Sequence, residues 1–204
     1  MKNYIIGIIC LSMAITAFAG CKKKDTTIEN LKSAITGETT ASRKYAAFAQ
    51  KAKDEKLDKI AKLFDAASNA EAAHAKKHTA VLEQMGEKMG GLDIKISVKT
   101  TKENLDDAYK GETHEIESMY PDFIKKAREE GKDEAVATFD WAFQVEKMHQ
   151  TFYKAAIDAL AKNDMKNLSD TYAVCPICGN TVAGKAPKTC PLCGAAQADF
   201  LVIK

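Results

Sequence analysis

The sequence has no excess of charge of either sign. Its 204 residues include 30 Lys and Arg against 28 Asp and Glu, so the formal net charge is only +2 at pH 7. Proteins that bind nucleic acid through its phosphates present a basic face, and the balanced composition gives no such footprint. We therefore expect no nucleic-acid partner, and we expect Lys and Glu to alternate on the solvated faces of helices.

The sequence also lacks a hydrophobic run long enough to form a stable membrane span. Its apolar run over residues 4–18 is short and ends in small residues before Cys21, which is typical of a secretory signal. The segment FAGC resembles a lipobox, which predicts a signal peptide at 1–20 and a lipidated Cys21 at the start of a Lys-rich tether at 21–27. Ordinary signal cleavage after Ala19 is the alternative. We expect a cell-envelope lipoprotein anchored at a membrane surface, periplasmic or outer.

Cysteine is scarce, and none is spare for a structural disulfide. Of six cysteines, Cys10 lies in the predicted signal, Cys21 ends it, and four form two Cys-Pro-x-Cys-Gly knuckles spaced C-x₂-C-x₁₁-C-x₂-C. A segment as short as residues 171–204 cannot bury enough apolar surface to fold alone, so a tetrahedral thiolate site must hold it together. Zinc and a single iron both suit four thiolates. The predicted ligands are Cys175, Cys178, Cys190 and Cys193.

The sequence does contain a stripe of apolar residues at helical spacing, here called a seam, that is interrupted by ionisable residues. The stretch NAEAAHAKKHTA places Glu71, His74 and His78 in line with apolar residues at alternating steps of three and four, where a packed helix buries its side chains. An isolated carboxylate there is costly to bury without protons, a partner or a metal. For this segment alone, a stripe turned outward to solvent is the alternative. We interpret His78 as packed or as a partner of the ligands, with direct ligation as the alternative.

Three further seams carry the same interruption. A second Glu-x-x-His lies at Glu146 and His149. Glu38 precedes Glu71 by 33 residues, and Glu112 precedes Glu146 by 34, so the chain is a weak internal duplication. Because residues three apart share a helix face, each Glu-x-x-His offers two ligands to one point. One Glu from each of two helices and a Glu-x-x-His from each of two others form the ligand set of a di-iron or di-manganese site inside a four-helix bundle.

The connections agree with such a bundle. Short polar stretches near residues 53–56 and 128–134 make each pair of helices antiparallel. Between the pairs, the 14 residues 89–102 could span about 46 Å, against about 42 Å for a helix of about 28 residues. Pro121 should kink or end the regular part of the third helix. We predict an all-α four-helix ferritin-like bundle with one long crossover over residues 28–165.

Taken together and in this order, these motifs resemble the rubrerythrin family. The resemblance covers residues 25–204 and implies a ferritin-like di-iron domain followed by a small metal-bound rubredoxin-like β domain. The pair Glu112-x-x-Glu115 is its most specific part, because the counterpart of Glu115 in the first half is Ala41. The implied metal ligands are Glu38, Glu71, His74, Glu112, Glu115, Glu146, His149 and the four knuckle cysteines.

The resemblance also implies roles for individual residues. In rubrerythrins, a carboxylate at the place of Glu115 and the histidine of the second helix, here His74, serve one iron in different redox states. Tyr45 and Tyr120 match family tyrosines that hydrogen-bond the ligands of the di-iron site. We count these two tyrosines and Glu115 as catalytic candidates.

The implied activity is that of a peroxidase in oxidative-stress defence. Two irons reduce hydrogen peroxide to water, and the four-cysteine iron resupplies electrons one at a time, in the family across a head-to-tail homodimer. The electron donor is not indicated by the sequence. Two alternatives stay open: a ferritin-like iron oxidase or iron store with a structural zinc ribbon, and an interaction module whose buried Glu and His pair only with each other.

Overall fold

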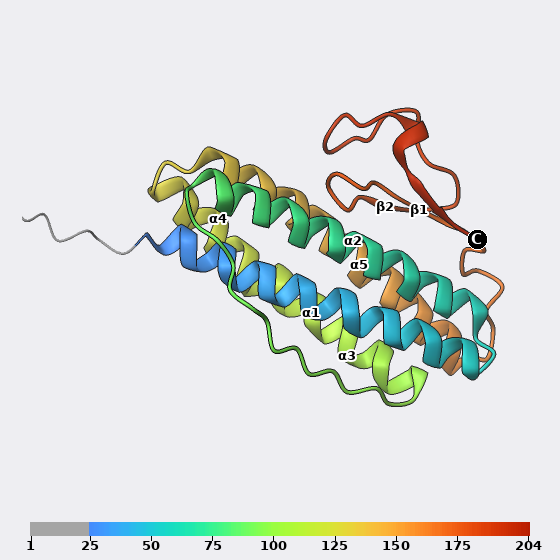
Figure 1. The fold of residues 1–204 in the computed structure, drawn as a ribbon. Coiled ribbons are helices and arrows are strands. Elements are labelled where there is room, and N and C mark those ends of the chain that lie inside the picture. The colour runs from blue at the N-terminus through green and yellow to red at the C-terminus, as the bar shows by residue number, and fades with distance from the viewer. Residues whose placement is uncertain (1–24) are drawn as a thin grey trace, which may run out of the picture.

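The computed structural model describes residues 25–204, which form a four-helix bundle and a small C-terminal β domain (Figure 1). Three helices are continuous: α1 Thr26–Asp54, α2 Asp58–Gln84 and α5 Asp133–Ala161. The remaining helix is divided into α3 Thr101–His114, a π-helical turn Glu115–Met119 and α4 Tyr120–Glu129. The predicted ferritin-like bundle is confirmed. The predicted signal peptide and the lipidated Cys21 lie outside the described residues, and within residues 25–204 no helix is long and apolar enough to cross a membrane.

Carboxylates cap the first turns of two helices of the bundle, α1 and α3. The Asp25 side chain accepts from the backbone N–H of Thr27 at 3.1 Å, and Glu130 accepts from the same N–H at 2.9 Å and from the Thr27 hydroxyl at 2.7 Å. At α3, Thr100 and Glu103 form a capping box. These contacts satisfy N–H groups that have no partner inside the helix and place negative charge at the positive end of its dipole. Glu130 also ties the start of α1 to the turn between α4 and α5.

The long connection runs along the outside of the bundle. Residues 85–100 contain no helix or strand and pass along α1 and α3 to the far end of the molecule (Figure 1). This is the expected crossover, and it makes α2 and α3 parallel. Two short turns at residues 55–57 and 130–132 make the other neighbouring helices antiparallel, as the polar stretches predict.

The third helix changes its hydrogen-bonding pattern just before Pro121. Pro121 has no N–H to give to the helical ladder, and its ring clashes with the preceding turn. The ladder widens over the five residues of the π turn, and Pro121 then lies in the first turn of α4, where a missing N–H costs little. The predicted interruption of the third helix is therefore present as a π turn, and Glu115 is the first residue of this turn.

Two apolar clusters hold the bundle on either side of a band of ionisable side chains. One cluster contains Phe48, Phe64 and Tyr153, and the other contains Leu31 and Phe139. All five are almost inaccessible to solvent. Burying each such side chain contributes about 1.5–3 kcal/mol. The clusters fix the helices at both ends, so the charged groups between them are buried without having to hold the fold together.

The C-terminal domain is a three-stranded antiparallel sheet with β1 at its centre. The strands are β1 Tyr172–Val174, β2 Thr181–Ala183 and β3 Leu201–Ile203, in the order β2-β1-β3, with a 3₁₀ turn at Gln197–Asp199. This domain lies over α2 and α5 near the middle of the bundle (Figure 1). The cysteines themselves form much of its small core, together with Ala173 and Phe200. The predicted small β domain is confirmed.

Candidate metal centres

The two Glu-x-x-His pairs face each other across the bundle. His74 Nδ1 on α2 lies 2.9 Å from Glu71 Oε2 and 2.9 Å from Glu146 Oε1. His149 Nδ1 on α5 lies 3.1 Å from Glu71 Oε1 and 2.8 Å from Glu146 Oε2. The four side chains are no more than 2% exposed. Each of the two carboxylates therefore faces both histidines, which is the arrangement of a ligand that bridges two cations.

Glu38 and Glu112 complete two overlapping ligand groups. Within each group, one ligand atom per residue lies within 4.8 Å of all the others. The groups are Glu38, Glu71, His74 and Glu146, and Glu71, Glu112, Glu146 and His149. They share the carboxylates of Glu71 and Glu146 and differ in one Glu and one His, and each of these unshared pairs comes from one half of the duplication.

The outer nitrogens of the histidines fix which nitrogen is free for a metal. His74 Nε2 lies 3.2 Å from the backbone carbonyl oxygen of Cys178, which can only accept a hydrogen bond. His149 Nε2 lies 3.1 Å from Thr181 Oγ1, and this hydroxyl already donates to the carbonyl oxygen of Gly179 at 2.9 Å. In the neutral imidazoles both Nε2 atoms therefore carry the proton. The lone pair of each Nδ1 faces the carboxylates, as in metal-binding histidines held by an outer hydrogen bond.

Burying so many ionisable groups shifts their pKa values strongly. Burial, and next the charge of neighbouring carboxylates, raises the pKa of Glu38, Glu112 and Glu115 well above the ordinary value. Burial acts to raise the pKa of Glu71 too, but the adjacent His149 leads the effects that hold it well below the usual range. Burial lowers the pKa of His149, yet the facing carboxylates prevail and raise it to about 9. The cluster needs positive charge in its middle, supplied by protons or by cations.

The donor set fits two divalent cations. Three buried carboxylate oxygens, Glu38 Oε2, Glu71 Oε1 and Glu146 Oε1, accept no hydrogen bond from the described residues. Leaving such atoms without a partner is costly, and a bound cation removes that cost. Carboxylate oxygens and imidazole nitrogens suit iron and manganese.

Tyr45 and Tyr120 each hydrogen-bond one carboxylate of the two ligand groups. The Tyr45 hydroxyl donates to Glu112 Oε1 at 2.8 Å, and the Tyr120 hydroxyl donates to Glu38 Oε1. Both tyrosines are buried. Glu115 is half-buried at the start of the π turn and belongs to neither ligand group. Its role as an alternating ligand stays a prediction.

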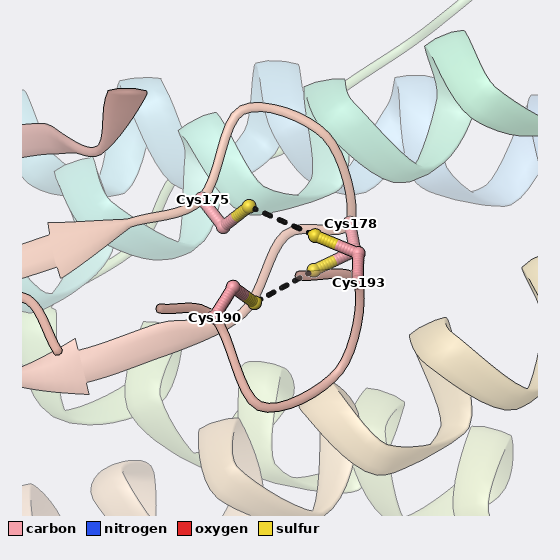
Figure 2. Close-up of side chains that lie close together, drawn as sticks. All are labelled: Cys175, Cys178, Cys190 and Cys193. Atoms are coloured by element: carbon pink, nitrogen blue, oxygen red, sulfur yellow. Dashed lines mark hydrogen bonds between the residues drawn. The ribbon is translucent and has the colours of Figure 1, made fainter. Parts of the chain in front are cut away.

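The four cysteines point toward one another from the two knuckles (Figure 2). Cys175 Sγ lies 3.5 Å from Cys193 Sγ, and Cys178 Sγ lies 3.6 Å from Cys190 Sγ. These separations are far longer than a disulfide bond of about 2.05 Å. Four sulfurs at about 2.3 Å from one central ion would lie about 3.8 Å apart, so the arrangement fits a tetrahedral metal.

Two residues that sequence reasoning missed connect the domains. One is Thr181, described above. The other is Gly179, at φ +76°, where an added Cβ would lie 2.2 Å from His74 Nε2. Gly194 holds the same place in the second knuckle at φ +79°, and a Cβ there meets nothing within 4 Å. The repeated Cys-Pro-x-Cys-Gly motif signals both glycines, but it does not say which knuckle touches the bundle.

The fold and both centres define a class of protein: a ferritin-like bundle with a carboxylate-bridged di-metal site, joined to a four-cysteine rubredoxin-like domain. A family model described as Rubrerythrin matches residues 29–157, and one described as Rubrerythrin, rubredoxin-like domain matches residues 174–201. The chain belongs to the rubrerythrin family. Membership of this family makes it an oxidoreductase.

Individual relatives are similar over almost their whole length. Nigerythrin of Nitratidesulfovibrio vulgaris is 37% identical over 175 residues, which cover 85% of this chain and 85% of the relative. Rubrerythrin of Porphyromonas gingivalis is 34% identical over 189 residues, covering 89% and 92%. Among solved structures, nigerythrin in its fully reduced, all-ferrous state superimposes with a TM-score of 0.77 at 32% identity, covering 97% of this chain and all of that one. A bacterioferritin from Rhodobacter capsulatus, at 24% identity and TM-score 0.59, shares the bundle fold over 69% of this chain.

Proposed function

We propose that this chain is a non-haem di-iron peroxidase that reduces hydrogen peroxide to water with electrons relayed from an iron in the four-cysteine site. The observation that carries the proposal is the contact between the two centres. His74, a ligand candidate of the bundle site, is 3.2 Å through Nε2 from the carbonyl oxygen of Cys178, a ligand candidate of the other. A structural zinc ribbon has no need to touch a di-metal site in this way.

The contact offers a short path for electrons. It leads from Cys178 Sγ along that residue's own backbone to the carbonyl oxygen, across one hydrogen bond and through the imidazole to His74 Nδ1. The absence of a side chain at Gly179 allows the approach, and the hydrogen bond between Thr181 and His149 fixes it a second time. One link starts at Cys178 in the first knuckle and the other at Thr181 in β2, and each ends on a histidine of the bundle.

Two ferrous ions held by the bundle carboxylates and histidines would supply two electrons to hydrogen peroxide, which takes up two protons as its O–O bond breaks and two waters form. The protein itself positions the ligands and excludes bulk water from the site. Tyr45 and Tyr120 each hold one terminal carboxylate in place by a hydrogen bond. The two apolar clusters keep bulk water away, which strengthens every electrostatic interaction inside. Glu115, at the edge of the site, would hold the same iron as His74, each in a different redox state.

Turnover with hydrogen peroxide as substrate tests this proposal. The iron-loaded chain with a one-electron chemical reductant should consume hydrogen peroxide catalytically, and loading the four-cysteine site with zinc should stop sustained turnover while leaving a single stoichiometric reaction. Equal turnover with zinc or iron in that site would overturn the relay. Oxidation of added ferrous iron by dioxygen, with no peroxide turnover, would favour the iron oxidase or iron store.

A homodimer stays a proposal, and a mixing experiment addresses it. In the described chain the C-terminal domain lies on its own bundle, so a relay within one chain needs no partner (Figure 1). A head-to-tail dimer would place the same contacts between two chains. Co-refolded Cys190→Ser and Glu146→Ala chains should regain turnover only if electrons cross between chains.

We further propose a membrane-anchored lipoprotein in the cell envelope, held by lipid on Cys21. The support is the FAGC segment and the lysines that follow it. Mass spectrometry of the mature chain from the membrane fraction should find diacylglycerol on Cys21 at the new N-terminus. A mature chain that begins at Gly20 would show ordinary signal cleavage instead.

A further inference from the structure

A chain of hydrogen bonds that ends at Glu38 joins α1, α2, α4 and α5. Thr138 Oγ1 on α5 lies 2.9 Å from His78 Nδ1 on α2, and His78 Nε2 lies 3.2 Å from the Tyr120 hydroxyl on α4. The Tyr120 hydroxyl donates to Glu38 on α1. The four side chains are no more than 2% exposed, so solvent does not compete for these bonds.

The direction of every proton in this chain follows from its end at Glu38. With cations in the bundle site, Glu38 is an ionised carboxylate that only accepts, so Tyr120 must give it the single phenolic proton. The Tyr120 oxygen is then an acceptor, and His78 Nε2 must carry the proton that it accepts. A neutral imidazole has one proton, so Nδ1 accepts from the Thr138 hydroxyl. Burial lowers the pKa of His78 to about 3, which agrees with a neutral ring.

Packing keeps the His78 ring in this orientation. Its centroid lies 5.3 Å from that of Phe139 and 6.1 Å from that of Tyr120. A flip of the ring would put carbon atoms, Cδ2 and Cε1, in the places of Nδ1 and Nε2, and it would break the hydrogen bonds to both Thr138 and Tyr120. Glu38 and Tyr120 thus select the tautomer with the proton on Nε2, and the Thr138 hydroxyl, which can donate or accept, stabilises this tautomer by donating to Nδ1.

The other half of the duplication has no such chain. Tyr45 donates to Glu112 at 2.8 Å, as Tyr120 does to Glu38. Tyr153 follows His149 by four residues, as His78 follows His74. The Tyr153 ring packs edge-on against Tyr45 at 5.7 Å, but its hydroxyl makes no hydrogen bond of acceptable geometry within residues 25–204. The Glu112 side is therefore supported by one tyrosine, and the Glu38 side by three linked side chains.

We propose that His78 and Thr138 are positioning residues for the di-metal site. They keep the Tyr120 hydroxyl donating its hydrogen bond to Glu38, and they so strengthen cation binding by the ligand group that contains Glu38 relative to the group that contains Glu112. This inference rests on the metal site of the proposed function but not on its reaction. Removing an outer hydrogen-bond partner of a metal ligand typically weakens metal binding about 10–100-fold. The two cation positions should accordingly respond differently to substitutions in the two halves.

The test uses the metal-stripped full chain and cobalt(II) as the probe. Cobalt in the four-thiolate site is recognised by its intense sulfur charge-transfer absorption and is counted separately. His78→Phe keeps a ring of similar size and removes both hydrogen bonds; it should weaken one bundle cobalt about 10–100-fold and spare the other. His78→Gln, whose amide can donate to Tyr120 and accept from Thr138, should restore most of the loss. Thr138→Val should lie between wild type and His78→Phe.

The duplication provides the matched control. Tyr153→Phe removes a hydroxyl at the corresponding place and should leave both cobalt affinities unchanged. Wild-type affinities in His78→Phe, or an equal loss in Tyr153→Phe, would overturn the proposal.

A measurement on the unmutated chain keeps the proposal testable if His78→Phe does not fold. The ¹⁵N chemical shifts of the histidine rings report which nitrogen carries the proton. In the zinc-loaded full chain, His78 should be neutral with the proton on Nε2, and Thr138→Val should allow a second tautomer. A wild-type His78 protonated on Nδ1 would contradict the proposed direction of the chain.

Discussion

The bundle and the C-terminal domain are held together by different means, although both are built around a metal centre. The bundle has apolar clusters on both sides of its charged band, so its fold does not depend on what fills the band. In the C-terminal domain, three cysteines belong to the core itself, beside a few alanines and Phe200. A metal is therefore an addition to one region and the centre of the other. We expect removal of metal to unfold the C-terminal domain and to leave the helices of the bundle folded.

Loss of the four-cysteine site should have the largest effect and should be confined to one region. Cys190→Ser removes one thiolate of the tetrahedral set, and a structural site of this kind contributes about 10–16 kcal/mol to folding. We expect the β domain to lose its resonances in a ¹H–¹⁵N spectrum and the visible absorption of its iron to disappear, while far-ultraviolet circular dichroism of the helices stays. Lys188→Ser, at an exposed neighbouring position, is the control. Persistence of the iron colour in Cys190→Ser would overturn the ligand assignment.

Substitution of one glycine should separate the two regions without unfolding either. Gly179→Ala and Gly194→Ala both place Cβ in a left-handed conformation, at a cost of about 1–2 kcal/mol each. Only the first also drives Cβ into His74, so only Gly179→Ala should slow electron transfer between the centres, by about 100-fold. Rapid mixing of the reduced chain with peroxide measures this rate. Equal rates in the two variants would mean that the docking seen here does not carry the electrons.

Within the bundle, Glu115→Ala should lower peroxide turnover without changing the fold. Glu115 stands outside both ligand groups, so its loss leaves the six central ligands in place. If it serves a metal in one redox state only, turnover falls by about 10–100-fold, while cobalt affinities change little. Glu117→Ala, exposed in the same π turn, is the control. Unchanged turnover in Glu115→Ala would remove this residue from the mechanism.

The smallest effect should come from the cap on α1. Although partial burial acts to raise the pKa of Glu130, hydrogen bonds from Thr27 hold it near 2. A depressed carboxylate pKa adds stability that is fully present above the ordinary value of about 4.5 and is lost as pH falls toward 2. Glu130→Gln should cost about 1 kcal/mol of unfolding free energy at pH 7, and the difference should shrink below pH about 4. Thermal unfolding of both proteins from pH 7 to 3, with Glu129→Gln as control, checks the sign; a difference that grows at low pH would contradict it.

The sequence predicts much of this molecule because its signals are periodic. The interrupted seams place six ligand candidates at fixed helical spacing, and the structure brings all six together in two groups. The length of residues 89–102 predicts the crossover, and the cysteine spacing predicts the small domain. These features depend on local geometry that repeats every turn or every knuckle.

Contacts between the bundle and the C-terminal domain could not be predicted from the sequence. The two Cys-Pro-x-Cys-Gly motifs differ only in Ile177 and Leu192, which does not distinguish the role of Gly179 from that of Gly194, since docking depends on the shape of a surface formed by distant segments. Thr138 was missed for a similar reason: its buried hydroxyl has meaning only beside His78, 60 residues earlier. The π turn was anticipated only as an interruption at Pro121, because its exact register depends on packing against α5.

The most direct test of the account is a rapid-mixing measurement on the iron-loaded, anaerobically reduced chain. Stoichiometric hydrogen peroxide is added, or dioxygen in a parallel run, and the visible absorption of the oxidised four-cysteine iron is followed. An electron relay predicts fast return of this absorption with peroxide and much slower return with dioxygen, because electrons leave the C-terminal domain for a peroxide-reducing di-iron site. A chain without this chromophore, or one that reacts equally fast with both oxidants, would contradict the relay and favour an iron oxidase with a structural zinc ribbon.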